Sequence, residues 1–345
     1  MAEGTTQGPR DAKVLFAGEP VPTASRKGAS GPAKRRSRAK VRAMVGSIAL
    51  AATIAVTVLA TQPARAALPV GDLGTAVSNF IFSPNSVAGA NNWNCKPSAQ
   101  HPNPVVLVHA TGVNLGANWV ALSPMLKNAG YCVYAFNYGM TWLSLGRIGG
   151  LGEISASART LSSFVDKVRS STGAAKVDMV GHSQGGMMPN YYIKFLGGAS
   201  KVGTFVGLAP SNHGTTVDGI VNLGSALNVL GFANSILWGV GVPGLQEQEA
   251  GSSFQRNLFA GGDTVAGPKY VVIETKYDIV VTPYTNAFLN GPNAKNVLVQ
   301  DQCPNDNVGH IGMFTDGPVL QNVMNSLGAN DPNFRANCTG YGLFL

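Results

Sequence analysis

Residues 177–186 are Val-Asp-Met-Val-Gly-His-Ser-Gln-Gly-Gly, and this stretch decides the fold. Its mostly apolar start predicts a buried strand, and the residues that follow it have a helical pattern. Between them lies a G-x-S-x-G motif, which is specific in a strand-turn-helix setting because the tight turn presents the serine hydroxyl at the carboxyl end of a sheet. Glycine at 181 and 185 gives the neighbouring backbone room to pack closely. We therefore predict that Ser183 is a nucleophile.

Short apolar runs alternate with helical patterns on both sides of this stretch, which is typical of a parallel sheet covered by helices on both faces. We expect strands at 105–108, 132–136, 177–180, 202–208, 270–275 and 296–299. We expect helices at 119–128, 154–170, 186–196 and 319–327. With the motif, this order predicts an α/β-hydrolase fold, a mostly parallel central sheet flanked by helices, in one catalytic domain at residues 67–345.

A serine hydroxyl is too weak an acid to attack an ester unaided, so it needs a base within hydrogen-bond reach and an acid that orients the base. In this fold the three residues follow the chain order Ser, acid, His. Only His213 and His310 follow Ser183, and no carboxylate lies between Ser183 and His213. We therefore predict that His310 is the base, and that His213, like His101, is a solvated surface residue.

The acid that orients the base has several candidates. We predict Asp278, because it follows the carboxyl end of the strand at 270–275, beside the position expected for the third member. Glu274 lies within that strand, so its side chain should point to one face of the sheet. Asp301 and Asp306 are near His310 in sequence and are the alternatives.

Negative charge that develops on a carbonyl oxygen needs fixed hydrogen-bond donors. The residue after the nucleophile supplies one of them, the backbone N–H of Gln184. We expect the second from the loop after the strand at 105–108, and we choose the N–H of Thr111. His109 in the same loop is expected to brace it rather than to act as a second base.

Residues 219–246 contain no charged side chain and many large apolar ones. Two interpretations are open: a pair of buried core helices, or a mobile cap whose apolar face covers the site. An insertion of this size between two strands is usually functional when it is not a linker. The cap would belong to an insertion at about residues 212–265.

The formal charge of +8 is located almost entirely at the N-terminus. Residues 1–66 contain 11 Lys and Arg against 3 Asp and Glu, so the 14 basic and 14 acidic side chains of the remainder balance. A near-neutral remainder argues against a nucleic-acid partner.

The N-terminal segment has the features of an export signal. A basic stretch at 34–40 precedes an uncharged run at 43–60, and Ala64-Arg65-Ala66 has the small-x-small pattern of a signal-peptidase site. We expect a signal peptide with a long basic leader at 1–66, cleavage near Ala66 and a secreted, extracellular protein. A membrane anchor is the alternative, because the uncharged run is about long enough to span a bilayer.

All four cysteines follow the expected cleavage site, and an even number in an exported chain suggests two disulfides. Of the three possible pairings we favour Cys95 with Cys132 and Cys303 with Cys338, because each pair closes a moderate loop at one end of the domain. Free buried thiols are the alternative. No Cys-x-x-Cys spacing suggests zinc, and we assign no metal ligand.

Taken together, these residues resemble the secreted lipases of actinobacteria, the class 2 lipase branch of the α/β-hydrolases. The resemblance covers roughly residue 93 to the C-terminus and rests on the segments 104–109, 118–119, 130–133, 181–186 and 209–215 and those around Asp278 and His310. It implies hydrolysis of acylglycerols or similar carboxylic esters by Ser183, Asp278 and His310, with no cofactor. One departure is Ala110, since the family usually has glycine after the histidine of this loop.

We therefore expect a secreted triacylglycerol lipase that acts on a lipid or ester substrate at a lipid–water interface, without a stable protein partner. The alternatives within enzymes are a short-chain carboxylesterase or polyester hydrolase, and an acyltransferase. The alternative from another class is a secreted binding protein on an inactive hydrolase scaffold.

Overall fold

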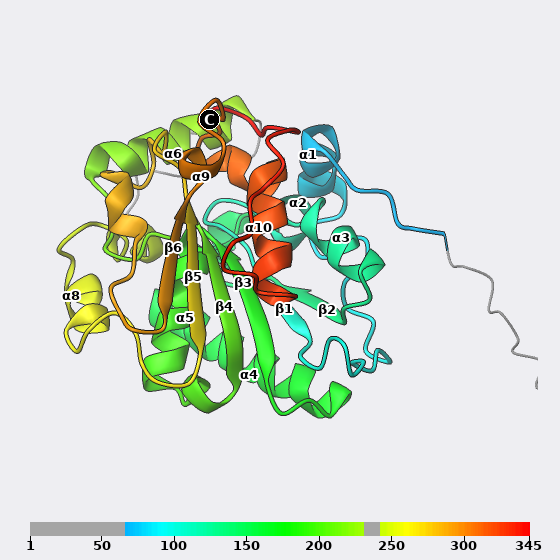
Figure 1. Cartoon of the computed structure of the whole chain (residues 1–345). Helices are drawn as coiled ribbons and strands as arrows, with labels where there is room; N and C mark the ends of the chain where they lie inside the picture. The colour runs from blue at the N-terminus through cyan, green and yellow to red at the C-terminus, as the bar shows by residue number, and fades with distance from the viewer. Residues whose placement is uncertain (1–65, 231–241) are drawn as a thin grey trace, which may run out of the picture. The chain divides into compact units, whose positions relative to one another are not determined.

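The computed structural model describes residues 66–230 and 242–345, which belong to one structural unit at 63–345. Six parallel strands form one sheet in the order β2-β1-β3-β4-β5-β6 (Figure 1). They are β1 (Val105–Val108), β2 (Val133–Phe136), β3 (Val177–His182), β4 (Val202–Leu208), β5 (Lys269–Glu274) and β6 (Ala294–Leu298). Every expected strand is found, with its ends within two residues of the prediction.

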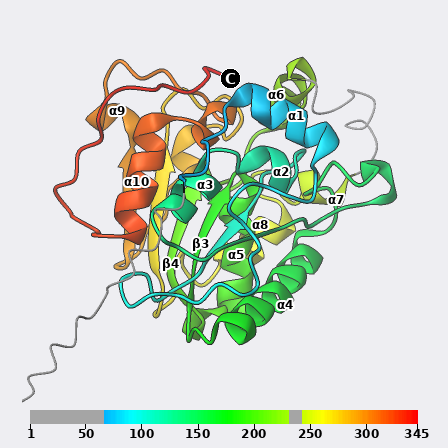
Figure 2. The ribbon, with the colours of Figure 1, turned by 90° about the vertical axis from the view of Figure 1, so that its right-hand side faces the viewer.

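Helices cover both faces of the sheet. In the described ranges they are α1 (Leu73–Phe82), α2 (Leu115–Asn118), α3 (Leu122–Asn128), α4 (Ile154–Thr172), α5 (Gln184–Phe195), α6 (Val217–Val229), α7 (Pro243–Gln246), α8 (Ser253–Phe259), α9 (Val299–Gln302) and α10 (Gly317–Leu327). Short 3-10 turns are η1 (Trp142–Ser144), η2 (Gly198–Ser200), η4 (Tyr284–Ala287) and η5 (Ile311–Phe314). Figure 2 shows α10 on one side of the strands and α4 on the other.

The alternation of side chains along each strand builds two cores. On β1, Val106 and Val108 belong to the core that contains α4 and α5, whereas Val105 and Leu107 belong to the core that contains α3 and α10. Both faces of every central strand are therefore buried, which explains the apolar runs without polar alternation. This arrangement confirms the predicted parallel sheet flanked by helices.

Two helical predictions need correction. The helix expected at 119–128 is shorter than predicted. It is α3, which starts at Leu122 because Pro124 has no N–H and is tolerated only in the first turn of a helix; α2 at Leu115–Asn118 precedes the expected range. The lead-in before residue 93, for which no helix was expected, contains α1. Its N-cap is Asp72, whose side chain accepts from the Thr75 N–H, and its Phe80 is buried in a core at the carboxyl end of the sheet.

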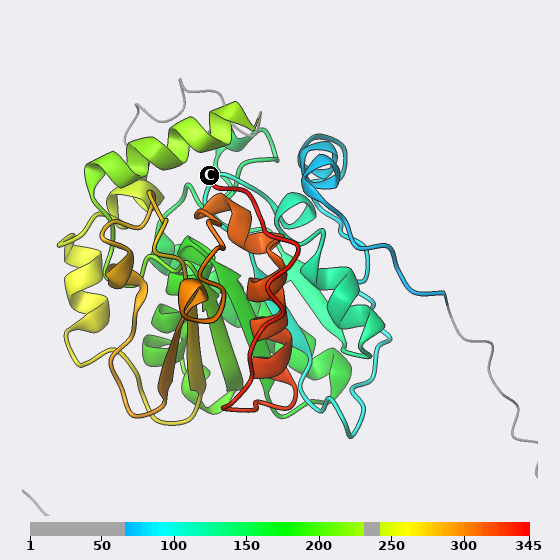
Figure 3. The same ribbon diagram turned by 45° about the horizontal axis from the view of Figure 1, so that its top comes forward.

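The strand order places the loops after β1 and β3 at the point where the chain reverses direction across the sheet. In open α/β sheets, ligands bind at the carboxyl ends of the strands beside such a reversal. Ser183 follows β3 directly. In Figure 3, α6 lies over this end of the sheet.

The predicted signal peptide and the uncharged run at 43–60 lie outside the described residues. Within the part of the chain that the structure describes, no helix is long and apolar enough to cross a bilayer.

Candidate active site

Ser183 occupies the turn between β3 and α5 with φ 55° and ψ −123°. A non-glycine residue in such a conformation costs on the order of 1–3 kcal/mol, so the surrounding structure must enforce it. A Cβ on Gly181 would overlap the carbonyl oxygen of Gly185, and a Cβ on Gly185 would overlap that of Val108. The backbone around the serine is therefore as tightly packed as the sequence motif predicts.

His310 and Asp278 lie together in two loops at the carboxyl end of the sheet. The Nδ1 atom of His310 lies 2.7 Å from Oδ2 of Asp278, and both side chains are fully buried. The other carboxylate oxygen of Asp278 accepts the backbone N–H groups of Val280 and Val281, at 2.7 Å each. Three donors therefore hold this carboxylate in place. Because the carboxylate accepts from Nδ1 of His310, the ring proton lies on Nδ1, and Nε2 can accept a proton.

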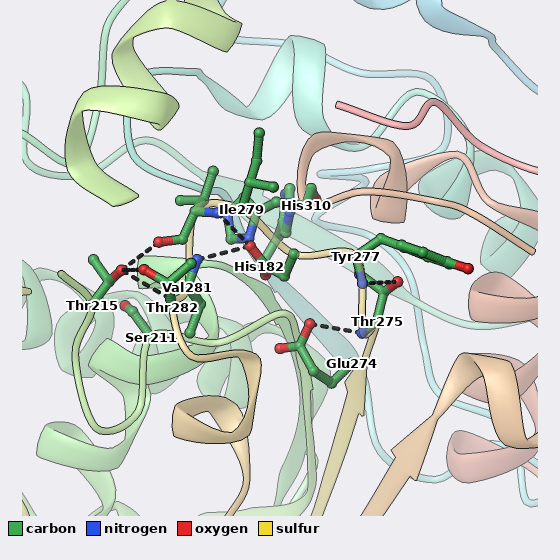
Figure 4. Close-up of polar contacts among 12 residues, drawn as sticks. His182, Ser211, Thr215, Glu274, Thr275, Tyr277, Ile279, Val281, Thr282 and His310 are labelled. Carbon is green, nitrogen blue, oxygen red and sulfur yellow. Dashed lines mark hydrogen bonds and ion pairs between the residues drawn. The ribbon is translucent and has the colours of Figure 1, made fainter. Parts of the chain in front are cut away.

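The opposite nitrogen of His310, Nε2, is buried and has no hydrogen-bond partner among the described residues. His182, which immediately precedes Ser183, anchors the His310 loop: its Nε2–H donates to the carbonyl oxygen of His310 at 3.0 Å, and the two ring centroids are 5.3 Å apart (Figure 4). Burial, and then His310, lowers the pKa of His182 to about 3, so this imidazole is neutral. No role for His182 was predicted from the sequence.

Ser183 and the Asp278 loop line one small apolar cavity, to which Ser183, Val280 and Val281 all contribute. The nucleophile, the imidazole and the carboxylate predicted from the sequence are thus at the same end of the sheet. The hydrogen bond between Asp278 and His310 is present, and Ser183 is connected to His310 through its neighbour His182.

The two predicted oxyanion donors are free to bind a ligand atom. Gln184 is the first residue of α5, so its N–H has no partner within the helix. In the β1 loop, the Ala110 N–H donates to Asn118 and the Gly112 N–H donates to Gly149. The Thr111 N–H between them has no hydrogen-bond partner among the described residues.

Residues 102–322, more than half of the chain, match the family described as lipase (class 2). This chain belongs to the class 2 lipases. Among solved structures, Aspergillus fumigatus lipase B is similar with 18% identity and a TM-score of 0.55 over 78% of this chain. The match covers 64% of that lipase, so the chain spans less than two thirds of its length. This similarity shows the α/β-hydrolase fold.

Two further structures are similar at lower scores. Bacillus licheniformis lipase BlEst2 in mature form is 14% identical, with a TM-score of 0.43 over 59% of this chain and 85% of its own. Paleococcus ferrophilus monoacylglycerol lipase is 17% identical, with a TM-score of 0.40 over 59% of this chain and 86% of its own.

The remaining histidines of this class 2 lipase have structural surroundings. His109 is fully buried, donates from Nδ1 to the Ala110 carbonyl at 2.8 Å and stacks on Tyr138 with ring centroids 4.4 Å apart. Burial lowers its pKa to about 4, as suits a neutral residue that braces the loop. His213 is partly exposed and pairs with Asp263 at 3.3 Å, and His101 packs on Tyr131.

Among the alternative acids, Asp306 is buried, but it accepts from the Val308 N–H and faces Asp316 rather than His310. Asp301 is exposed on α9. Glu274, expected to point to one face of the sheet, is fully buried and contacts Asp278. Among the described residues no group of three or more His, Cys, Asp or Glu side chains is placed to hold a metal ion.

The site of this class 2 lipase is covered by α6. Two apolar cavities, each of about 10 Å³, flank the end of β3. Leu223 lines the one that contains Ser183, and Leu227 lines the one that contains Thr111 and His182. Each is large enough for about one water molecule and too small for an acyl chain.

Both favoured disulfides are present in this class 2 lipase, and the described residues include no free cysteine. Cys95 pairs with Cys132 and Cys303 pairs with Cys338. The first connects the segment before β1 to the start of β2. The second connects the end of α9 to the segment after α10, on the side of the sheet that supports the His310 loop.

Proposed function

We propose that this protein is a carboxylic ester hydrolase that acts through an acyl-enzyme on Ser183, with His310 as base and Asp278 as the acid that orients it. The observation that carries the proposal is the buried hydrogen bond of 2.7 Å between Asp278 and Nδ1 of His310, which leaves Nε2 unpaired at the end of the sheet that holds Ser183. Membership of the class 2 lipases and the strained serine turn support it.

In this mechanism the Ser183 Oγ attacks the carbonyl carbon of the ester while its proton passes to Nε2 of His310. The N–H groups of Gln184 and Thr111 bind the oxyanion of the tetrahedral intermediate. The imidazolium then gives its proton to the leaving alcohol. Water attacks the acyl-enzyme by the same route, with His310 again accepting a proton, and releases the carboxylic acid.

For the substrate we propose acylglycerols or similar esters of fatty acids. The surfaces next to Ser183 are apolar, and α6 supplies Leu223 and Leu227 to them. These two cavities among the described residues are too small for an acyl chain, so we propose that α6 moves aside when substrate enters, as a cap would. The outer side of α6 exposes valines, among them Val221 and Val229 at 60% and 73%, next to polar residues such as Asn228, and we propose that these valines face lipid when the cap is displaced.

The first test is covalent labelling with a fluorophosphonate probe, which reacts with activated serines. We expect labelling of the native protein at pH 8 and none of the Ser183→Ala variant. His310→Ala should abolish labelling, whereas His213→Ala, the matched control, should not. An unlabelled native protein would favour the alternative of a binding protein on an inactive scaffold, and loss of labelling in the His213 variant alone would refute the choice of base.

The second test is the rate of hydrolysis across p-nitrophenyl esters of increasing acyl length. Acyl chains that occupy the space under α6 should be hydrolysed with higher kcat/KM as they lengthen, because each buried methylene contributes about 0.8 kcal/mol. A clear preference for the shortest ester would replace the lipase proposal by the short-chain carboxylesterase or polyester hydrolase. Alcohol acceptors added to the same assay would reveal acyl transfer.

We also propose that the protein is secreted after cleavage near Ala66. Two disulfides and the basic leader with its uncharged run support this location. Mass spectrometry of the N-terminus of the exported protein tests it, since retention of the leader in a membrane fraction would favour the anchor. An actinobacterial source stays a prediction of the sequence resemblance.

A further inference from the structure

Glu274 is an ionisable side chain in surroundings that disfavour a charge. It is the last residue of β5, it has no exposed surface, and the residue opposite it on β6 is Leu298. Its Oε1 accepts the backbone N–H of Thr275 at 2.7 Å (Figure 4). Its Oε2 is buried and has no donor among the described residues. An ionised carboxylate would leave this buried oxygen unsatisfied, which is strongly unfavourable.

The side chain of Glu274 lies beside that of Asp278, close enough for a hydrogen bond between the two carboxyl groups. Two carboxyl groups can form such a bond only when one of them holds a proton. Asp278 accepts two backbone N–H groups and the imidazole N–H of His310, so both of its oxygens already act as acceptors. Glu274 accepts one N–H. The proton therefore belongs to Glu274, and placing it on Oε2 gives the unsatisfied oxygen a partner.

Burial, and then the charge of Asp278, raises the pKa of Glu274 well above its usual range. Among the described residues, Asp278 is the only acidic group placed against Glu274, and His310 bonds to Asp278. On the neighbouring strands, β6 places Leu298 opposite Glu274 and β4 continues into Ala209, both uncharged.

We propose that Glu274 is a positioning residue of the catalytic apparatus: a carboxylic acid that stays uncharged and donates a hydrogen bond to Asp278. The inference rests on the proposed function of Asp278 and His310. The bond occupies a further lone pair of Asp278, fixes its carboxylate against His310, and keeps the charge of the Glu274–Asp278 pair at −1. A second negative charge would stabilise the imidazolium form of His310 and reduce the fraction of free base near neutral pH.

The first variant, Glu274→Gln, tests the charge. Glutamine keeps an acceptor for the Thr275 N–H and a donor for Asp278. At low pH, kcat/KM falls as His310 takes up a proton, and this fall is the acid limb of the pH profile. If Glu274 is uncharged, the acid limb of the variant should stay within about 0.5 pH unit of the native limb. If Glu274 is ionised, the substitution removes a negative charge near His310, and the limb should move to lower pH by more than that. The second result would overturn the inference.

The second variant, Glu274→Leu, removes the donor at similar volume. We expect kcat per active site to fall about tenfold with little change in KM, because a misplaced Asp278 affects the transition state rather than substrate binding. The acid limb should move to higher pH, because the full charge of Asp278 then acts on His310. A Leu variant with native kcat and a native limb would overturn the inference even if Gln behaves as expected.

Rates are to be normalised to sites titrated with a fluorophosphonate, so that partial misfolding lowers the site count and not kcat. Asp178→Asn is the matched control, because Asp178 is another buried carboxyl, with Oδ1 bonded to the Thr204 N–H and to Asn103 away from the site. Its profile should match the native one. A native protein with neither labelling nor hydrolysis would overturn the proposed function, whereas an active protein whose Glu274→Gln limb shifts would overturn this inference alone.

Discussion

The substitution Asp278→Asn separates the orientation of His310 from the shape of the site. The two backbone N–H groups of Val280 and Val281 both point at Oδ1 of Asp278, at 2.7 Å. Asparagine must keep its carbonyl oxygen at that position, because an amide N–H₂ there would face two donors. Its N–H₂ group is then directed at Nδ1 of His310, which has to accept. The proton of the imidazole moves to Nε2, where it blocks the transfer from Ser183.

The magnitude follows from this change of tautomer. A neutral amide leaves the packing almost unchanged, but the base is lost and the imidazolium has no anion beside it. In serine proteases, the same change of Asp to Asn lowers kcat by about 10⁴, equivalent to about 5 kcal/mol of transition-state stabilisation. We expect a loss of this order in kcat here, with KM changed by less than about threefold.

The assay is steady-state hydrolysis of a p-nitrophenyl ester, with a thermal melt to verify that the variant is folded. Asp178→Asn serves as the control for the loss of a buried carboxylate, and we expect it to keep native kcat. A folded Asp278→Asn variant that retains more than about a tenth of native kcat would refute the tautomer argument. If Asp306→Asn lowers kcat more than Asp278→Asn does, Asp306 would be the acid that orients His310.

Three further predictions concern stability. Gly185→Ala should lower the free energy of unfolding by about 3 kcal/mol or more, because the new Cβ overlaps the Val108 carbonyl oxygen. Urea unfolding measures this change. A variant whose free energy of unfolding stays within about 1 kcal/mol of the native value would contradict the packing of the turn. Burial raises the pKa of Asp316, which faces Asp306, to about 7. This folded pKa is above the unfolded value of 3.8, so stability that is present below pH 3.8 is lost as the pH rises to about 7. Asp306→Asn removes the facing carboxyl group, so it should stabilise the protein at pH 8 and not at pH 4. An equal effect at both pH values would contradict repulsion between the two carboxyl groups. Replacing Cys303 and Cys338 together by Ala should lower the free energy of unfolding by about 4 kcal/mol, because the disulfide closes a loop with a sequence separation of 35 residues. An unchanged midpoint of urea unfolding would show that this disulfide hardly constrains the unfolded chain.

Most of the fold could be predicted from the sequence because its strands are buried on both faces. Such strands appear as short apolar runs whose limits are set by turns, so β1 and β4 were predicted with their observed ends. The helices were less determined. Pro124 marks where α3 can begin, but α1 has a short amphipathic pattern whose packing against the carboxyl-end core is visible only in the tertiary structure.

The proposed roles of Ser183 and His310 follow from sequence order alone, because the motif indicates the serine and elimination leaves one histidine. The acid does not follow in this way. Asp278, Asp301 and Asp306 all satisfy the order, and the tertiary structure supports Asp278 because it directs Asp278 at His310 and Asp306 at Asp316. The physical reason is that a hydrogen bond depends on the meeting of two loops that are distant along the chain.

The succession of strands and helices along the chain and the strained serine turn could be predicted from the sequence, because local sterics and chain connectivity control them. The sequence favoured one of three disulfide pairings, and the structure contains that pairing. Only the tertiary structure decided that His182 anchors the His310 loop, that α6 covers the site and that Glu274 meets Asp278. These contacts join residues through space, and the protonation state of Glu274 depends on burial and a neighbouring charge, neither of which is encoded in any short stretch of residues.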